Sequence, residues 1–346
     1  MYEQKPLLHA RQAAHRPGQL RTLALDITPI CNLKCSYCYA ETFVKSKPID
    51  LTVYKRLCDE AFEMGVFHYI FQGGEPILDP QRLEALIGYA HPESTYLNLI
   101  SNGWAMTAER IDWLKDLQID KITYSLDSGI PEEHDKIRGK GSHQRVLQAI
   151  EDTLKAGLLC GISTVVTRTS LYSEGFQMLY DFTLKKDIRF HIQIAEPVGK
   201  WDAQTDLLMR LEDSAFIEKL FHDSPTLSNG QKLIHRDIYG SLSSPNCPAA
   251  TNFMSISANG ECLPCNFLQY SLGRISEKPL SQMRSEILQS PWFSEKHESC
   301  ICGEDAEFIE QFILPYAGQT KPLDAYSVFG LKALSPPSKP DEGRSS

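Results

Sequence analysis

The amino-acid sequence predicts an α/β fold built on a parallel sheet, with a small cysteine-bearing domain after it. The evidence is that short β-rich runs alternate with amphipathic stretches. The six β-rich runs cover residues 22–28, 67–72, 95–101, 121–126, 161–167 and 189–195. Apolar residues recur at helical spacing in residues 50–64, 80–90, 107–117, 143–156 and 174–185. Since helices separate the strands, neighbouring strands are expected to run parallel.

Several of these strands have one apolar and one polar face. Phe190, Ile192 and Ile194 alternate with His191 and Gln193. A curved sheet that is covered by helices outside and faces a ligand cavity inside produces this alternation, and so do strands half exposed to water. Six strand and helix units are too few for a closed eight-stranded barrel. A partial barrel and a doubly wound open sheet both fit the pattern.

Changes in composition divide the chain into five parts. Residues 197–245 are irregular apart from a helical stretch at 211–221, and the tail after Phe329 is rich in Pro, Ser and charge, with little apolar surface to bury. We expect an N-terminal extension, a catalytic core, a linker, a second domain and a partly disordered tail, at residues 1–20, 21–225, 226–246, 247–312 and 313–346.

The overall composition is that of a folded globular protein. The 346 residues are 42% hydrophobic and 23% charged, with 35 basic and 44 acidic side chains and a net charge of −9. This balance disfavours nucleic acid and anionic membranes as partners, because both require a basic face. We see no signal peptide and no run of membrane-spanning length. We therefore expect a cytoplasmic protein that acts on a peptide or a small molecule.

Ten cysteines are many for a protein of a reducing compartment, and most of them are clustered. Cys31, Cys35 and Cys38 follow directly after the first strand. Three thiolates on one loop can hold an iron–sulfur cube and leave one iron without a protein ligand, and an open position is typical of a catalytic metal site. The alternatives are a thioredoxin-like motif and a zinc site shared with Cys262 and Cys265, but neither accounts for Cys31.

The motif Cys-x-x-x-Cys-x-Tyr-Cys, with Tyr37 before the third cysteine, resembles the signature of the radical S-adenosylmethionine (radical SAM) superfamily. The resemblance extends from about residue 20 to residue 199. It implies a partial (β/α)6 barrel, similar to part of a TIM barrel, with a 4Fe-4S cluster at the C-terminal mouth. It also implies that this cluster binds S-adenosylmethionine (SAM) and cleaves it reductively to a 5′-deoxyadenosyl radical.

Gly73, Gly74 and Glu75 end the second strand and look like the glycine-glycine-glutamate motif of this family. Glycines let the backbone approach a ligand closely, and a carboxylate accepts hydrogen bonds from an ammonium group. The resemblance implies that these residues hold the amino group of SAM. Taken alone, such a sequence would more often form an ordinary turn between strand and helix.

Asn102, Ser125 and Arg138 resemble the family more loosely, and we expect all three at the SAM site. In related enzymes a serine on the fourth strand and an arginine before glycine help to hold the amino-acid part of SAM. Arg138 would supply a planar, permanently charged partner for the carboxylate. The alternatives are a turn-forming role for Asn102 and a surface ion pair for Arg138.

Four cysteines in the C-terminal part predict a second cluster. Cys247 and Cys265 frame a hairpin, in which a strand at residues 253–257 precedes an Asn-Gly turn, and Cys300 and Cys302 follow. The frame is similar to the opening of the auxiliary-cluster domains called SPASM and twitch. It implies one auxiliary 4Fe-4S cluster with ligands from these four residues, although its fourth ligand stays open. The alternative is a structural zinc hairpin.

Other residues of interest lie outside these motifs. Cys262 is an extra thiol in the C-terminal frame, and we expect it to donate a hydrogen atom to a product radical if it is free. His191 and Gln193 are candidates for substrate contacts, although a histidine that only lines the barrel fits as well. Cys58, in the helix at residues 51–64, is expected to be a buried apolar filler.

Taken together, these features predict a radical SAM enzyme of the oxidoreductase or peptide-modifying type. An electron from a flavodoxin- or ferredoxin-type donor would reach the first cluster, and the resulting radical would abstract a substrate hydrogen. We expect maturation of a ribosomally made peptide or protein by epimerisation, thioether or C–C bond formation. The alternatives are a small-molecule enzyme of cofactor, tetrapyrrole or antibiotic biosynthesis and, from another class, a zinc-binding thiol redox or adaptor protein. With only about thirty residues before the cluster motif, we expect no N-terminal peptide-recognition domain.

Overall fold

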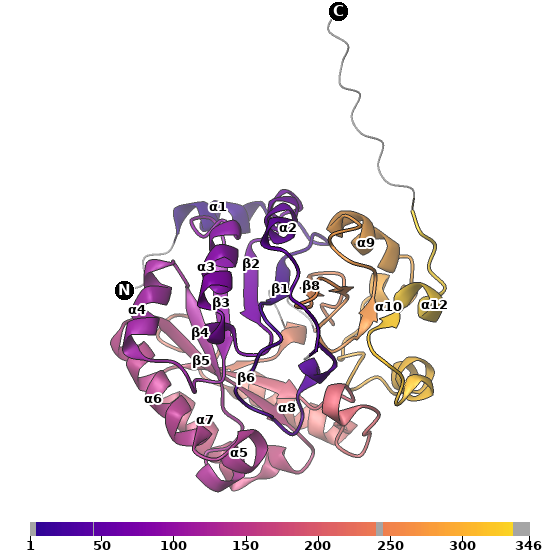
Figure 1. The fold of residues 1–346 in the computed structure, drawn as a ribbon. Coiled ribbons are helices and arrows are strands. Elements are labelled where there is room, and N and C mark those ends of the chain that lie inside the picture. Colours follow the sequence, from indigo (N-terminus) through magenta and orange to yellow (C-terminus); the bar gives the residue numbers. More distant parts are fainter. Residues whose placement is uncertain (1–4, 44, 240–244, 335–346) are drawn as a thin grey trace, which may run out of the picture.

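The computed structural model describes residues 5–43, 45–239 and 245–334. Its centre is a curved, almost wholly parallel sheet with helices packed along the outside (Figure 1). Six strands follow one another in chain order and pair with their neighbours in parallel. They are β1 (Thr22–Asp26), β2 (His68–Gln72), β3 (Tyr96–Ser101), β4 (Lys121–Ser125), β5 (Leu159–Val166) and β6 (Arg189–Ile194). The prediction of six parallel strands is confirmed.

The sheet continues beyond both ends of this six-stranded unit. In the described part of the chain its order is β7-β6-β5-β4-β3-β2-β1-β8-β9, so it is a partial barrel that does not close. The added strands are β7 (Ile234–His235), β8 (Phe253–Ile256) and β9 (Cys262–Leu263). β8 runs parallel to β1, and β9 returns antiparallel to β8 as the predicted hairpin. β7 lies within residues 226–246, for which the sequence predicts a linker.

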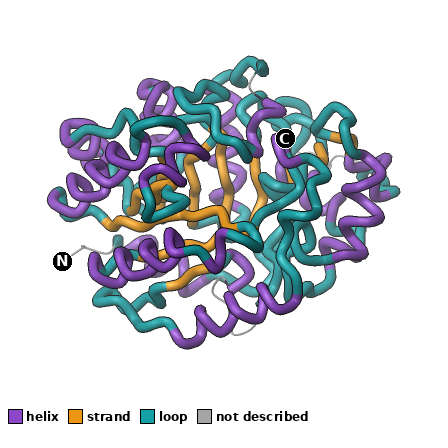
Figure 2. Tube along the Cα trace, turned by 90° about the horizontal axis from the view of Figure 1, so that it is seen from below, coloured by secondary structure: helices purple, strands orange, loops and turns teal. Residues whose placement is uncertain are grey.

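Helices form the outer layer and pack on the apolar strand faces (Figures 1 and 2). The helices of the barrel are α1 (Pro6–Ala14), α2 (Leu51–Glu63), α3 (Pro80–Tyr89), α4 (Ala108–Asp116), α5 (Pro131–Arg138), α6 (Ser142–Lys155), α7 (Glu174–Lys186) and α8 (Leu211–Asp223). Several begin at side-chain caps: Asp50 accepts a hydrogen bond from the backbone N–H of Thr52, and Ser173 accepts one from that of Phe176. α1, α5 and the strand β7 were not predicted.

β6 has an apolar, buried outer face and a polar inner face, as its alternating sequence predicts. Phe190, Ile192 and Ile194 are at most 3% exposed and belong to the hydrophobic core. Arg189 and Gln193, which point to the other face, are partly exposed. The inner face is therefore not filled by apolar packing, as expected of a barrel that receives a ligand.

The C-terminal region packs against the hairpin side of the sheet (Figure 1). It contains α9 (Leu280–Ile287), α10 (Pro291–Ser294), α11 (Ala306–Phe308), α12 (Ala325–Phe329) and the small parallel pair β10 (Tyr270–Ser271) and β11 (Leu323–Asp324). Phe329 packs on the ring of Tyr270, so the residues after 313 are well packed up to α12. The end of the predicted disordered tail, residues 335–346, lies outside the described residues. No described helix combines the length and apolarity needed to span a membrane.

Candidate functional site

The loop after β1 carries Cys31, Cys35 and Cys38 at the end of the sheet where the carboxyl termini of the parallel strands meet. All three cysteines are free thiols. Side chains from the end of β3 and from α5 point at their sulfurs: Asn102 Nδ2 lies 3.9 Å from Cys31 Sγ, and Arg138 Nη1 lies 3.9 Å from Cys35 Sγ. The structure thus brings the predicted cluster ligands together with two of the predicted SAM contacts.

The chemistry of this donor set fits a 4Fe-4S cluster that binds SAM. Burial raises the pKa of Cys31 to about 11 and also raises the pKa of Cys38, so both are protonated thiols at neutral pH until a metal displaces the proton. N–H groups near the sulfurs are the environment that tunes iron–sulfur clusters. With three thiols in the loop, one iron of a cube is left for a ligand other than the protein.

The two glycines after β2 let that strand end pass directly against the cysteine loop. Gly74 N donates to Thr28 O at 2.8 Å, and Glu75 N donates to Ile30 O at 2.7 Å. A Cβ on Gly74 would lie 2.1 Å from Ile30 O, and Gly73 has φ +123°, a value that favours glycine. Both glycines are therefore required by close backbone approach, as the motif suggested.

The carboxylate of Glu75 is 1% exposed and is held by the end of β3. Ser101 Oγ donates to Oε1 and the backbone N–H of Asn102 donates to Oε2, both at 2.8 Å. Burial raises the pKa of Glu75 to about 7 against the opposing effect of these hydrogen bonds. A cationic partner would stabilise the ionised form of this buried acid, and the ammonium group of SAM is one.

Arg138 already has a carboxylate partner, Asp127, which the sequence analysis did not identify as a functional residue. Its Nε donates to Asp127 Oδ2 at 2.5 Å, and Tyr37 OH donates to the same carboxylate at 2.9 and 3.0 Å. Arg138 Nη2 also contacts Tyr37 OH. The aromatic residue of the cysteine motif is thereby tied to α5 and to the end of β4. Ser125, the last residue of β4, lies beside Ser163 of β5.

The four cysteines predicted for the second cluster line one cavity of about 580 Å³. They are Cys247, Cys265, Cys300 and Cys302. Burial raises the pKa of all four thiols, so they would release protons on binding metal. Four thiols on one cavity fit an iron–sulfur cluster, and the structure brings the four predicted ligands together there.

Glu196 is a further residue of this cavity that no motif indicated. Its Oε1 accepts a hydrogen bond from Gln193 Nε2 at 3.1 Å and lies 3.4 Å from Cys300 Sγ. Its Oε2 is buried without a hydrogen-bond partner among the described residues. Gln193, a predicted substrate contact, also lines the cavity. The only sequence signal for Glu196 is its position two residues after β6.

A buried ion pair fixes the loop that carries Cys300. Arg236 Nη2 donates to both carboxylate oxygens of Glu304 at 2.9 Å, and the backbone N–H of Cys300 donates to Glu304 Oε2 at 2.9 Å. Both side chains of the pair are 5% exposed. The short segment after β7 is therefore part of the framework of the second cysteine group.

Cys262 is not brought to either cysteine group. It is fully buried in the β8–β9 hairpin and does not line the cavity, and burial raises the pKa of its thiol above the usual range. A hydrogen-atom donor must reach the product, so this position does not support the role predicted for Cys262. Cys58 is also fully buried in the hydrophobic core, as expected of an apolar filler.

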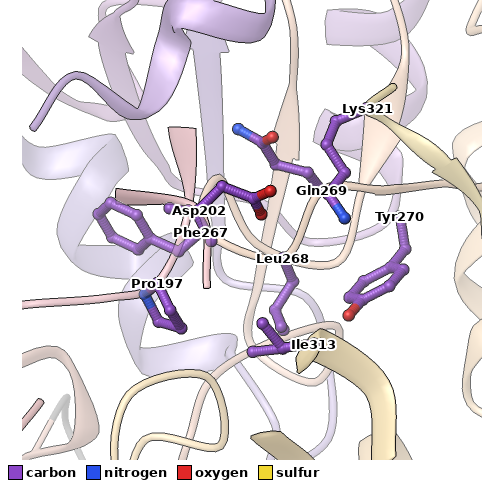
Figure 3. A pocket seen from close by; sticks show the side chains of 9 residues that line it. Pro197, Asp202, Phe267, Leu268, Gln269, Tyr270, Ile313 and Lys321 are labelled. Atoms are coloured by element: carbon purple, nitrogen blue, oxygen red, sulfur yellow. The ribbon is translucent and has the colours of Figure 1, made fainter. Parts of the chain in front are cut away.

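The segments that carry the two cysteine groups contact each other through the residues that follow Cys38 and Cys265. Gln269 Nε2 donates to the carbonyl oxygen of Tyr39 at 2.7 Å, and the ring of Phe267 packs edge-on against that of Tyr39. A second cleft of about 310 Å³ lies beside these contacts, where side chains that follow β6 converge with side chains of the C-terminal region (Figure 3). Phe267 and Leu268 line both the cleft and the cysteine cavity. The two cavities therefore share a wall.

His191, the other predicted substrate contact, lies deeper in the barrel than Gln193. Its Nε2 is 3.4 Å from Asp237 Oδ1, and His235 Nε2 is 3.6 Å from the same oxygen. Ser163 Oγ lies 3.3 Å from His191 Nδ1. This polar cluster on the inner face of β5, β6 and β7 includes Asp237, which also lines the cysteine cavity.

Comparison with known proteins supports this assignment of the two parts. The family model of the radical SAM superfamily matches residues 25–182, and that of the SPASM iron–sulfur cluster-binding domain matches residues 247–304. An AdoMet-dependent heme synthase of Methanosarcina barkeri is 24% identical over 294 residues, which are 76% of this chain and 81% of that protein. A PqqA peptide cyclase of Streptomyces rochei is 25% identical over 251 residues, 70% of this chain and 68% of that protein.

Solved structures share the fold of both parts. SuiB of Streptococcus suis, bound to the precursor peptide SuiA, matches with a TM-score of 0.61 at 18% identity, covering 80% of this chain and 66% of that chain. The enzyme anSMEcpe with bound AdoMet matches with a TM-score of 0.60 at 19% identity, covering 84% and 83%. The two family matches, which together cover more than half of the sequence, show that the chain belongs to the radical SAM superfamily and carries a SPASM domain. Its cofactors are therefore SAM, a 4Fe-4S cluster and auxiliary iron–sulfur clusters.

Proposed function

We propose that this radical SAM enzyme matures a ribosomally made peptide or protein. The observation that carries the proposal is that two groups of free cysteines belong to adjoining parts of one barrel, where Gln269 and Phe267, close after Cys265, contact Tyr39, the residue after Cys38. Such an arrangement serves a reaction that begins at one centre and passes an electron to the other. We further propose residues 21–225 as the catalytic core and residues 247–312 as the auxiliary domain.

The first cysteine group would hold the cluster that binds SAM. When bound there, the cluster supplies the electron that cleaves SAM to the 5′-deoxyadenosyl radical, which abstracts a substrate hydrogen. In this proposal Cys31, Cys35 and Cys38 are its ligands. Asn102 and Arg138 orient the loop by donating N–H groups toward Cys31 and Cys35.

The strand ends next to this loop would hold SAM itself. Gly73 and Gly74 leave room for its backbone-like amino-acid part, and Glu75 would accept the ammonium group. Ser125 would contact the same part of SAM from the end of β4. The carboxylate of SAM would share the guanidinium of Arg138 with Asp127, which keeps that side chain extended across the cysteine loop.

The second cysteine group would hold the auxiliary 4Fe-4S cluster. We propose Cys247, Cys265, Cys300 and Cys302 as its ligands, since all four line the cavity. With four thiolate ligands such a cluster would have no open iron, which would favour a role as an acceptor of the electron left when a substrate radical is oxidised. Burial raises the pKa of Glu196 well above its usual range, so this residue would lie beside Cys300 as a neutral carboxylic acid.

Peptide maturation is favoured by the relatives that combine the same two domains. SuiB and anSMEcpe have both been seen with peptides bound, and their fold covers the barrel and the SPASM domain of this chain. The heme synthases, which match over most of their length, favour a small-molecule substrate as the second candidate. A flavodoxin- or ferredoxin-type protein would supply the electron in either case.

The proposal is tested by anaerobic reconstitution and assay. The purified protein should take up about eight irons and release 5′-deoxyadenosine when SAM and dithionite are added. A short peptide encoded next to this gene should then lose two hydrogens, as measured by mass spectrometry. Cys35→Ala should abolish SAM cleavage, whereas Cys58→Ala, at a buried cysteine outside both groups, should keep all iron. Conversion of a tetrapyrrole instead of the peptide would contradict peptide maturation.

A further inference from the structure

The inner face of the barrel carries two cationic side chains side by side. Lys121 is the first residue of β4 and Arg189 the first of β6, and β5 lies between them. The β5 residue between them is Gly161, where an added Cβ would lie 3.0 Å from Arg189 O and 3.1 Å from Lys121 Nζ. The side chain of Lys121 therefore lies across the glycine toward β6.

Neither cation has an acidic partner among the residues that the structure describes. No ion pair within 4.0 Å involves Lys121 or Arg189 in that part of the chain. Arg189 Nη2 contacts only the neutral ring of His235, whose Nδ1 is 3.1 Å away, and Arg189 Nε is buried without a hydrogen-bond partner. Burial lowers the pKa of both cations, that of Lys121 to about 8 with a further contribution from Arg189.

An unpaired charge in a protein interior costs free energy unless a ligand of opposite charge compensates it. Lys121, Arg189 and Gln193 are each partly exposed, so a ligand can reach them from solvent. Gln193, near the C-terminal end of β6 on the same polar face, lines the cysteine cavity. The charge of Asp237 raises the pKa of both cations, but its carboxylate lies against His191 and His235.

We propose that Lys121 and Arg189 form a subsite for a carboxylate group of the substrate inside the barrel. The subsite itself depends only on these two residues. The identity of its ligand rests on the proposed function, under which the carboxylate belongs to an acidic side chain or the C-terminus of the peptide. Arg189 offers a planar set of donors that matches a carboxylate, and Lys121 adds a second charge from β4, on the other side of β5.

A metal ion is the competing occupant, because His191, His235 and Asp237 present ligand atoms within 4.8 Å of one another. Two features argue against it. Arg189 donates to Nδ1 of His235, so the proton of that neutral ring sits on Nε2, the atom that would have to bind the metal. The adjacent charges of Arg189 and Lys121 also repel a further cation.

Thermal melting of the reconstituted holoenzyme at constant ionic strength tests the subsite. The probes are acetyl-glutamate N-methylamide, its neutral isostere acetyl-glutamine N-methylamide, free glutarate and zinc sulfate. The glutamate probe should raise the melting temperature by about 2 °C and the glutamine probe should not. The double variant Lys121→Met/Arg189→Met should lose this shift and melt above the wild type without probe. Lys155→Met, at a lysine 72% exposed, should behave as the wild type.

The outcomes separate the inference from the proposed function. Equal shifts with both amide probes, or an undiminished glutamate shift in the double variant, would overturn the subsite. Stabilisation by zinc that His235→Gln removes would overturn it in favour of a metal. A larger shift with glutarate than with the glutamate probe would support the subsite and assign it to a free acid. Release of 5′-deoxyadenosine by the wild type is measured separately, so either proposal can fail alone.

Discussion

Glu304→Gln should strongly destabilise the second cysteine group. The substitution keeps the size of the side chain but leaves Arg236 as a buried cation, 5% exposed, without the carboxylate that now meets it at 2.9 Å. Breaking such a pair costs about 3–5 kcal/mol. The backbone N–H of Cys300 also loses an ionised acceptor. Equilibrium urea unfolding of the iron-free protein should show this loss of stability, and reconstitution should yield about four irons in place of eight.

Two comparisons make this prediction specific. Lys296 and Glu298 form an exposed pair nearby, at 3.0 Å with side chains 46% and 75% exposed, so Glu298→Gln should cost less than about 1 kcal/mol. The double variant Arg236→Met/Glu304→Met should be more stable than Glu304→Gln, because no buried charge remains unpaired. Equal losses for Glu304→Gln and Glu298→Gln would refute the reasoning, as would full iron content in Glu304→Gln.

Three further predictions concern single positions. Cys265→Ala should lose the auxiliary iron, whereas Cys262→Ala should keep it and cost only about 1–2 kcal/mol of stability, as iron analysis and urea unfolding would show. Gly74→Ala should prevent cluster assembly, because its methyl group would lie 2.1 Å from a backbone oxygen of the cysteine loop; Gly88→Ala, with open space around it, should assemble normally by absorbance. Burial lowers the pKa of His134 to about 4. Between pH 6.5 and 4 the unfolded chain therefore takes up a proton at this residue that the folded protein does not, and the free energy of unfolding falls as the pH falls. His134→Gln should remove about 1.4 kcal/mol per pH unit of that loss between pH 6.5 and 4, and an unchanged pH profile would contradict this.

The sequence was sufficient to predict the six barrel strands and the C-terminal hairpin. Their signals are local: apolar residues at period two, flanking helices at period 3.6, and an Asn-Gly turn between β8 and β9. The role of the glycines after β2 could also be predicted. The close approach of Gly74 to the cysteine loop leaves no room for a side chain, so the constraint appears in the sequence as a glycine.

The remaining site residues could not be predicted, because their roles arise from contacts between distant segments. Asp127 acquires its role only when α5 brings Arg138 against it. Glu304 meets Arg236 across 68 positions of sequence, and a pair at that separation leaves no periodic signal. The two-residue strand β7 is too short for any pattern to show. Cys262 was predicted to donate a hydrogen atom, but in β9 it is fully buried in the hydrophobic core, and its distance from the cavity leaves no local signal in the sequence.

The pairing of β8 with β1 has a consequence for attempts to divide this protein. Backbone hydrogen bonds from Phe253–Ile256 occupy the side of Thr22–Asp26 that is not used by β2. A shortened chain that ends before the hairpin would leave β1 as an exposed edge strand with unpaired backbone N–H and C=O groups. Such an edge can pair with the strands of other molecules and cause aggregation. Expression of the N-terminal portion alone would therefore yield an aggregating fragment, and an insoluble truncation would say nothing about whether the auxiliary centre takes part in turnover.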